Sequence, residues 1–80
     1  MLKEKLIQEI KDITEKYNIY YLILSNNNLY RLKYPNRTNL IRIKNDFLYD
    51  ITTFHLLELQ FTLIQIKYDA NKQRKKEDIK

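Results

Sequence analysis

The sequence predicts an α+β fold with an N-terminal helix, an antiparallel meander of three to four strands and a long C-terminal helix. Apolar residues recur every three or four positions near the N-terminus, alternate with polar residues in the middle, and return to a helical spacing in the last third. Eighty residues suffice for one hydrophobic core. We therefore expect a single compact domain at 1–70, followed by a polar, basic tail at 71–80.

The N-terminal helix is indicated by an apolar stripe. Its members, at steps of four, four, three and four residues, are Leu2, Leu6, Ile10, Ile13 and Tyr17. Charged and amide side chains occupy the other side of the same segment. Asn18 comes next, and asparagine tolerates the left-handed backbone conformation that ends many helices. The predicted helix therefore spans residues 2–17 and serves as a packing element.

Two strands are predicted to follow as a hairpin. Residues 19–24 are apolar on both faces and rich in strand-forming side chains, which indicates a strand buried on two sides. A run of three asparagines suits a tight turn into a second, alternating strand at 29–34. Two registers remain possible: a two-residue turn pairs the Tyr30 face with the Tyr21 side, and a three-residue turn pairs it with the Leu22 side.

A second pair of strands is predicted beyond the only proline, after a loop at 35–39. Residues 40–44 alternate between apolar and basic side chains, which is the pattern of a half-buried strand. Asn45 and Asp46 are turn-forming residues that would close a second hairpin into 47–51. Both helices are expected to pack on one face of this sheet and to leave the other face in solvent.

The last third of the chain fits either a strand or a helix at 54–68. Residues 57–63 alternate as in a strand, but the alternation changes phase at Leu63. On a helical wheel the same residues form two apolar stripes, so we predict a helix. It would begin near Thr52 or Thr53, either of which can cap it, and end near Lys76.

A helix with apolar residues on two sides needs cover on both sides, and one small sheet covers only one. The second stripe would meet either the N-terminal helix or the same helix in another subunit. We expect a homodimer. Its predicted interface consists of Leu56, Leu59, Leu63 and Ile66.

The residue inventory argues against an enzyme. The chain has no cysteine, and His55 is its only histidine, so thiol catalysis and the usual zinc sites are excluded. A serine triad would need both His55 and Ser25, the only serine, which we interpret as a turn residue. Glycine-rich phosphate loops are absent because glycine is absent. We therefore predict no catalytic residue, no metal and no cofactor.

The charge distribution favours binding to nucleic acid, with DNA preferred. Residues 29–44 hold five basic side chains and no acid, and several of them alternate with apolar residues along the predicted strands. The hairpin at 40–51 would also place Arg42 opposite Tyr49. A cation that contacts phosphate would then lie beside a ring that can stack on a base. The predicted nucleic-acid-binding residues are Arg31, Lys33, Arg37, Arg42, Lys44, Tyr49, Lys72, Arg74, Lys75 and Lys76.

The alternative function is that of a protein-binding inhibitor or regulator, since exposed tyrosine and arginine are common at interface hot spots. The residue usage follows A/T-rich codons, which suggests a phage, plasmid or other A/T-rich genome and agrees with either role. No signal peptide or membrane span is evident in the sequence, so the expected location is the cytoplasm.

Overall fold

The computed structural model of the chain describes residues 1–24, 28–31 and 37–78. Within these residues the order of elements is α1 (Leu2–Tyr17), β1 (Tyr21–Ile23), β2 (Leu29–Arg31), α2 (Arg37–Asp50), the short 3-10 helix η2 (Ile51–Thr53) and α3 (Leu56–Asp78). The described part of the chain is therefore mostly helical, and its only sheet has two antiparallel strands.

The predicted helix at 2–17 is confirmed, and it ends as its sequence indicates. Asn18 adopts the left-handed conformation with φ of 53°, and it is the only described residue with a positive φ. The amides of Asn18 and Ile19 both donate to the carbonyl oxygen of Thr14, which satisfies a carbonyl that the helix itself leaves free. The chain then turns sharply into β1.

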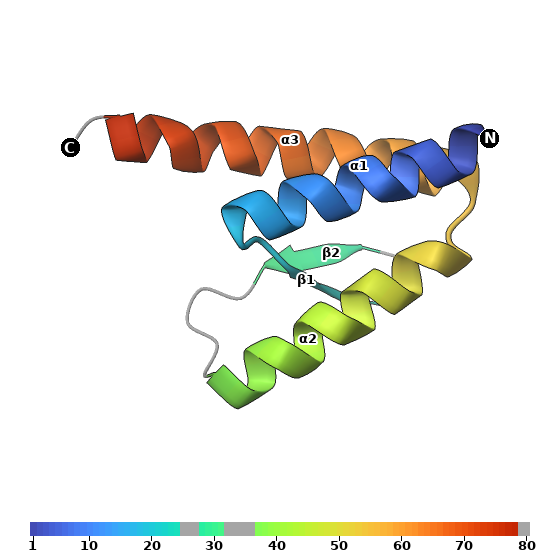
Figure 1. The fold of residues 1–80 in the computed structure, drawn as a ribbon, viewed down its shortest axis with the longest axis horizontal. Coiled ribbons are helices and arrows are strands. Elements are labelled where there is room, and N and C mark those ends of the chain that lie inside the picture. Colours follow the sequence, from blue (N-terminus) through green and yellow to red (C-terminus); the bar gives the residue numbers. More distant parts are fainter. Residues whose placement is uncertain (25–27, 32–36, 79–80) are drawn as a thin grey trace.

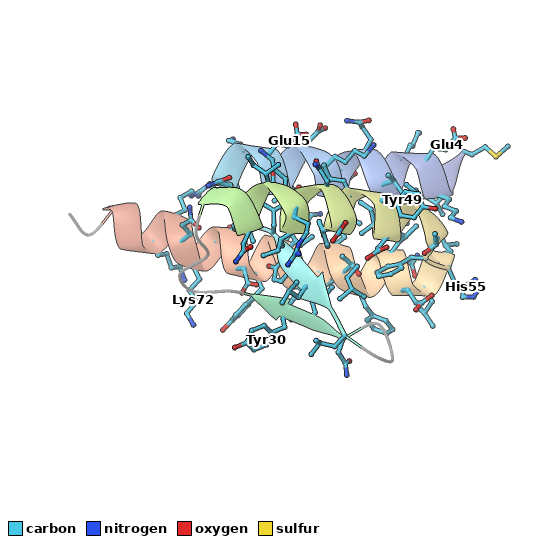
Figure 2. All side chains as sticks on the ribbon, turned by 90° about the horizontal axis from the view of Figure 1, so that it is seen from below. Glu4, Glu15, Tyr30, Tyr49, His55 and Lys72 are labelled. Carbon is cyan, nitrogen blue, oxygen red and sulfur yellow. The ribbon has the colours of Figure 1, made fainter. Side chains whose placement is uncertain are left out.

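The hairpin takes the register of the three-residue alternative. Leu22 pairs with Tyr30, and the amide of Leu24 donates to the carbonyl oxygen of Asn28 over 2.8 Å. Tyr21 faces the core, whereas Leu22 and Tyr30 lie on the outer face of the hairpin. Figure 2 shows Tyr30 pointing away from the helices. The strands are shorter than expected, and residues 32–36 lie outside the described residues.

The predicted meander of three to four strands is wrong, because α2 occupies the segment in which its second half was expected. The predicted loop at 35–39 is likewise replaced by helix from Arg37 onwards. Leu40, Ile43 and Phe47 recur at steps of three and four residues and turn toward the core, with Ile51 continuing the series into η2. Over so short a segment the same residues also alternate, so two periodicities compete. In the helix, every large apolar side chain of α2 except Ile41 and Tyr49 is buried in the core or packed against it.

Helix at 54–68 is confirmed over all but its first two residues, and α3 begins at Leu56 instead of at Thr52 or Thr53. The hydroxyls of both threonines donate hydrogen bonds to carbonyl oxygens three residues earlier in the chain. Thr52 bonds Tyr49 and Thr53 bonds Asp50, so both side chains stabilise the turn of η2. The side chain of Glu58 instead accepts a 2.9 Å bond from the amide of His55, as in one half of a capping box. At its other end α3 continues through most of the segment predicted as a tail.

The helices α1 and α3 lie side by side and run in the same direction (Figure 1). Two contacts fix their register: Lys67 lies 3.9 Å from Glu9, and the side-chain amide of Gln73 donates to the carbonyl oxygen of Tyr17 over 3.1 Å. The ion pair is more than half exposed and adds little stability, so apolar packing between the helices is the main attraction.

The hairpin joins α2 to the α1–α3 pair and completes the core. The ring of Phe47 on α2 lies 5.8 Å from that of Tyr21 and 6.4 Å from that of Tyr20, both measured between centroids. On its other side Tyr21 donates its hydroxyl to Asp69 of α3. Buried residues therefore come from α1, β1, α2, η2 and α3, and no pair of elements forms the core alone.

Candidate interaction surfaces

The outer side of α3 carries a continuous row of large apolar side chains. Leu57, Phe61, Ile64 and Tyr68 are each between 61% and 64% exposed. Their spacing of four, three and four residues places them along one side of the helix, over about 16 Å at 1.5 Å per residue. We call these four residues the α3 stripe.

The α3 stripe lies opposite the side of the helix that enters the core. Leu59, Leu63, Ile66 and Ala70 form that inner side and are all buried. Ile64 and Ile66 show the division clearly, because residues two apart on a helix point in nearly opposite directions.

The four residues predicted as a dimer interface lie mostly on the inner side of the helix. Of its four residues, Leu59, Leu63 and Ile66 are buried inside the subunit, and Leu56 alone remains partly exposed at the start of α3. A side chain that is buried inside one subunit cannot contact a second subunit unless the first subunit unfolds. Two apolar stripes are evident in the sequence, but which one faces the core depends on α1 and on the hairpin.

One signal in the sequence does separate the two stripes of α3. The inner stripe continues toward the C-terminus into Ala70, whereas the α3 stripe continues into Lys72 and Lys75. Lysine is almost never fully buried without a partner, so the stripe that runs into lysines is the one that faces solvent.

The borders of the α3 stripe are polar. Gln60 and Lys67 follow one edge, on the side of α1, and Gln65 and Lys72 follow the other, on the side of the hairpin. An apolar strip with a polar border is the composition found at protein interfaces.

Four of the predicted nucleic-acid-binding residues lie on α2: Arg37, which was expected in a loop, and Arg42, Lys44 and Tyr49, which were expected on a strand face. Arg42 and Tyr49 are exposed and project from the same side, two turns apart, with Asp46 between them. Lys44 projects elsewhere, and its ammonium lies 5.1 Å from the centre of the Tyr20 ring. The predicted row of cations on one sheet surface is therefore wrong for α2, and Lys44 contributes to packing through a cation–π contact.

Three elements that carry other predicted basic residues have an end toward the same end of the molecule. β2 ends at Arg31, α2 begins at Arg37, and the C-terminal half of α3 extends toward the same end (Figure 1). The side chains of Lys72, Arg74 and Lys75 are exposed there. Lys33 lies outside the described residues, and Lys76 is placed only as part of the α3 backbone.

The outer face of the hairpin is a second, smaller apolar surface. Leu22, Leu24 and Tyr30 are partly exposed on it. Because the described strands are only three residues long, this surface is shorter than the α3 stripe.

Two titratable groups of the described residues, His55 and Asp69, have contacts that connect parts of the fold. His55 is exposed at the start of α3, where its backbone amide bonds Glu58. Asp69 accepts from the hydroxyl of Tyr21 and from the side-chain amide of Gln65, contacts that connect elements of the fold. Ser25 lies outside the described residues. Across residues 1–24, 28–31 and 37–78, no three histidine or acidic side chains are grouped so as to hold a metal ion.

No helix in the described part of the chain combines the length and the apolar character that a membrane span requires. In comparisons with known proteins, no family model matches the chain, and no significant match is found among curated proteins or solved structures.

Proposed function

We propose that this chain is a protein-binding module and that the α3 stripe is its docking surface. The observation that carries the proposal is that four large apolar side chains, spaced three or four residues apart along one side of a helix, are exposed. Single exposed leucines are ordinary in soluble proteins, but a contiguous apolar row with a polar border is typical of a surface that a partner covers. Helices that bind in this way present anchors at steps of three and four residues.

The expected affinity follows from the area that remains to be buried. Fully burying a large apolar side chain is worth about 1.5–3 kcal/mol, so covering the exposed part of these four is worth about 1–2 kcal/mol each. A partner with an equal set of side chains doubles that total to about 8–16 kcal/mol. Association itself costs about 4–15 kcal/mol. The gain and the cost are of similar size, so the stripe suits a weak and reversible association whose strength depends on the further contacts that the partner adds.

Phe61 and Tyr68 are the expected anchors of the interface. Aromatic side chains bring large contact areas with few rotatable bonds, and they dominate hot spots. Both are 63% exposed, whereas the aromatic side chains of Tyr20, Tyr21, Phe47 and Phe54 are buried in the core. The same helix therefore separates a structural apolar side from a binding one.

Site-specific photo-crosslinking tests this proposal, because it captures a partner whose identity is unknown. A photoreactive amino acid is placed at Ile64 in the cells that produce the chain, with Gln8, an exposed residue of α1, as the matched control position. We expect a discrete crosslinked protein species from position 64 and none from position 8. Equal or absent crosslinking at the two positions would exclude the α3 stripe as a protein interface.

Nucleic-acid binding remains a second proposal, now based on the basic end of the molecule instead of a sheet face. It is supported by the exposed cations of the last turns of α3 and by the position of Arg31 and Arg37 toward the same end. Cations in that arrangement contact phosphates without reading sequence.

Charge reversal tests the second proposal. The double variant Lys72→Glu/Lys75→Glu is compared with Lys3→Glu/Lys5→Glu, which makes the same charge change on exposed residues of α1. If the basic end of α3 contacts phosphates, the first variant should reduce the slope of log K against log salt on duplex DNA by about 1.8, at about 0.9 for each lost contact. The α1 variant should leave the slope nearly unchanged. An equal loss in both variants, or no DNA or RNA binding by the wild type at low salt, would dismiss this function.

A further inference from the structure

We infer that the partner that covers the α3 stripe is a second copy of this chain, bound so that the two α3 helices run antiparallel. The inference rests on the proposed function, since it names the occupant of the same surface. It is carried by the spacing of the stripe, by the order of its side chains and by the charges that continue it.

The spacing of the stripe reads the same in both directions. Its steps of four, three and four residues are symmetric about the midpoint between Thr62 and Leu63. A two-fold axis at that midpoint brings Leu57 beside Tyr68 of the second copy, and Phe61 beside Ile64 of the second copy. All eight apolar side chains then meet apolar side chains, and the surface is complementary to itself, as a two-fold interface requires.

The order of side chains also favours the antiparallel arrangement. The stripe alternates aliphatic and aromatic residues, so an antiparallel pair sets each aromatic ring against an aliphatic side chain. A parallel pair in register sets Phe61 against Phe61 and Tyr68 against Tyr68. Interdigitation of large with smaller side chains gives the denser packing.

The charges beyond the stripe decide more strongly between the two directions. Lys72, Arg74 and Lys75 follow the stripe on exposed positions. A parallel dimer would gather six of these cations at one end and place Lys67 beside Lys72 of the second copy. The antiparallel dimer carries the two basic ends to opposite sides of the assembly, each beyond the point where the partner's α3 begins. Along its borders Lys67 then lies near Gln60, and Glu58 near Gln65, so no like charges are opposed.

The stripe is short for a helix pair, yet α3 does not depend on the dimer for its structure. Its inner side is already packed in the core, and Lys67 and Gln73 connect it to α1. The binding surface is therefore formed before association, which removes the ordering cost that a free helix would carry.

The oligomeric state of the full chain is the first measurement. Sedimentation equilibrium of the wild type should give twice the 9.9 kDa mass of one chain at tens of micromolar, with dissociation on dilution. The test variant is Ile64→Asp, and the matched control is Ile41→Asp, which changes an isoleucine of similar exposure on α2. We expect Ile64→Asp to raise the dimer dissociation constant by about 100-fold or more, because it places two carboxylates in the apolar seam. Ile41→Asp should leave that constant within about threefold. Circular dichroism confirms that both variants are folded.

The direction of the helices is tested with cysteines, since the chain has none of its own. Leu57→Cys and Tyr68→Cys are prepared separately, mixed and oxidised. An antiparallel dimer gives the mixed disulfide between the two variants, because the two sites meet across the seam. The homodisulfide of Leu57→Cys should be scarce, since its two sites lie about 16 Å apart along the seam. A predominance of homodisulfides would show a parallel dimer and overturn the arrangement.

The failure of this inference is distinguishable from the failure of the proposed function. A monomeric wild type at a few hundred micromolar, or a dimer that Ile64→Asp leaves intact, would refute the second copy as the occupant. If position 64 then crosslinks to a different protein, the stripe is still a protein-binding surface with another partner. If position 64 crosslinks to nothing, both are refuted.

Discussion

Replacement of Phe47 by alanine is expected to remove about half of the free energy of unfolding of the protein. Phe47 is buried, and its ring lies against both Tyr20 and Tyr21, so it holds α2 to the hairpin. Truncation of a buried phenylalanine costs about 3–5 kcal/mol. The total free energy of unfolding of a domain of this size is about 4–12 kcal/mol, at about 0.05–0.15 kcal/mol per residue. The midpoint of urea unfolding of the variant should therefore fall to about half of the wild-type value.

Tyr49→Ala is the matched control, since Tyr49 lies two residues further along α2 and is 71% exposed. Its effect on the free energy of unfolding should stay within about 0.5 kcal/mol. Urea titration followed by circular dichroism measures both. The pair also discriminates between the two possible structures of this segment, because residues 47 and 49 share a face in a strand and point apart in a helix. Similar losses in the two variants would therefore contradict α2 itself.

Ile66→Ala is expected to give the second large effect. Ile66 is buried on the inner side of α3, and truncation of a buried isoleucine costs about 2–5 kcal/mol because a cavity remains. Ile64→Ala removes the same atoms from the α3 stripe and should change the free energy of unfolding by less than about 0.5 kcal/mol.

Both isoleucine variants are measured by urea unfolding at submicromolar protein, so that subunit stability is observed apart from any association. If Ile64→Ala cost as much as Ile66→Ala, the division of α3 into an inner side and an outer side would be wrong. If Ile66→Ala left the free energy of unfolding unchanged, Ile66 would not be in the core. The interface predicted from the sequence, which includes Ile66, could then contact a second subunit.

The two long periodic segments could be predicted from the sequence because the helical pattern continues over their full length. Sixteen residues of α1 repeat a helical stripe and stop at Asn18. In α3 the change of phase near Leu63 breaks the strand pattern but not the helical one. The length of each segment distinguishes a helix from a strand, because an incorrect period departs further from the observed apolar positions with every turn.

The segment that forms α2 could not be assigned with the same security. Residues 40–44 and 47–51 are each too short to separate alternation from a helical step, and Asn45 and Asp46 resemble a turn. The deciding contact is the one between Phe47 and the tyrosines at the start of the hairpin, Tyr20 and Tyr21, which are 27 and 26 residues away in the chain. Tertiary packing of this kind overrides local propensity and is not visible in a short window.

Only part of the candidate site could be predicted from the sequence, for a related reason. The double stripe of α3 indicates an uncovered apolar side, but the side predicted as the interface is the one that the core buries. Which side becomes the core depends on the elements that pack against α3. The hairpin contacts Asp69 through Tyr21, and α1 contacts Lys67 through Glu9. The basic residues follow from composition, whereas their distribution over α2, β2 and α3 requires the fold.

The left-handed turn at Asn18 has a consequence for the denatured chain. Since the described backbone enters positive φ at that position alone, and asparagine accepts it, this part of the fold is built without glycine. A chain of this length with average usage would contain about five or six glycines. Each glycine replaced by a residue with a side chain restricts the unfolded ensemble by about 0.4–1 kcal/mol, where the native conformation permits it. Where the native conformation permits every such replacement, the absence of glycine lowers the entropic cost of folding by about 2–6 kcal/mol.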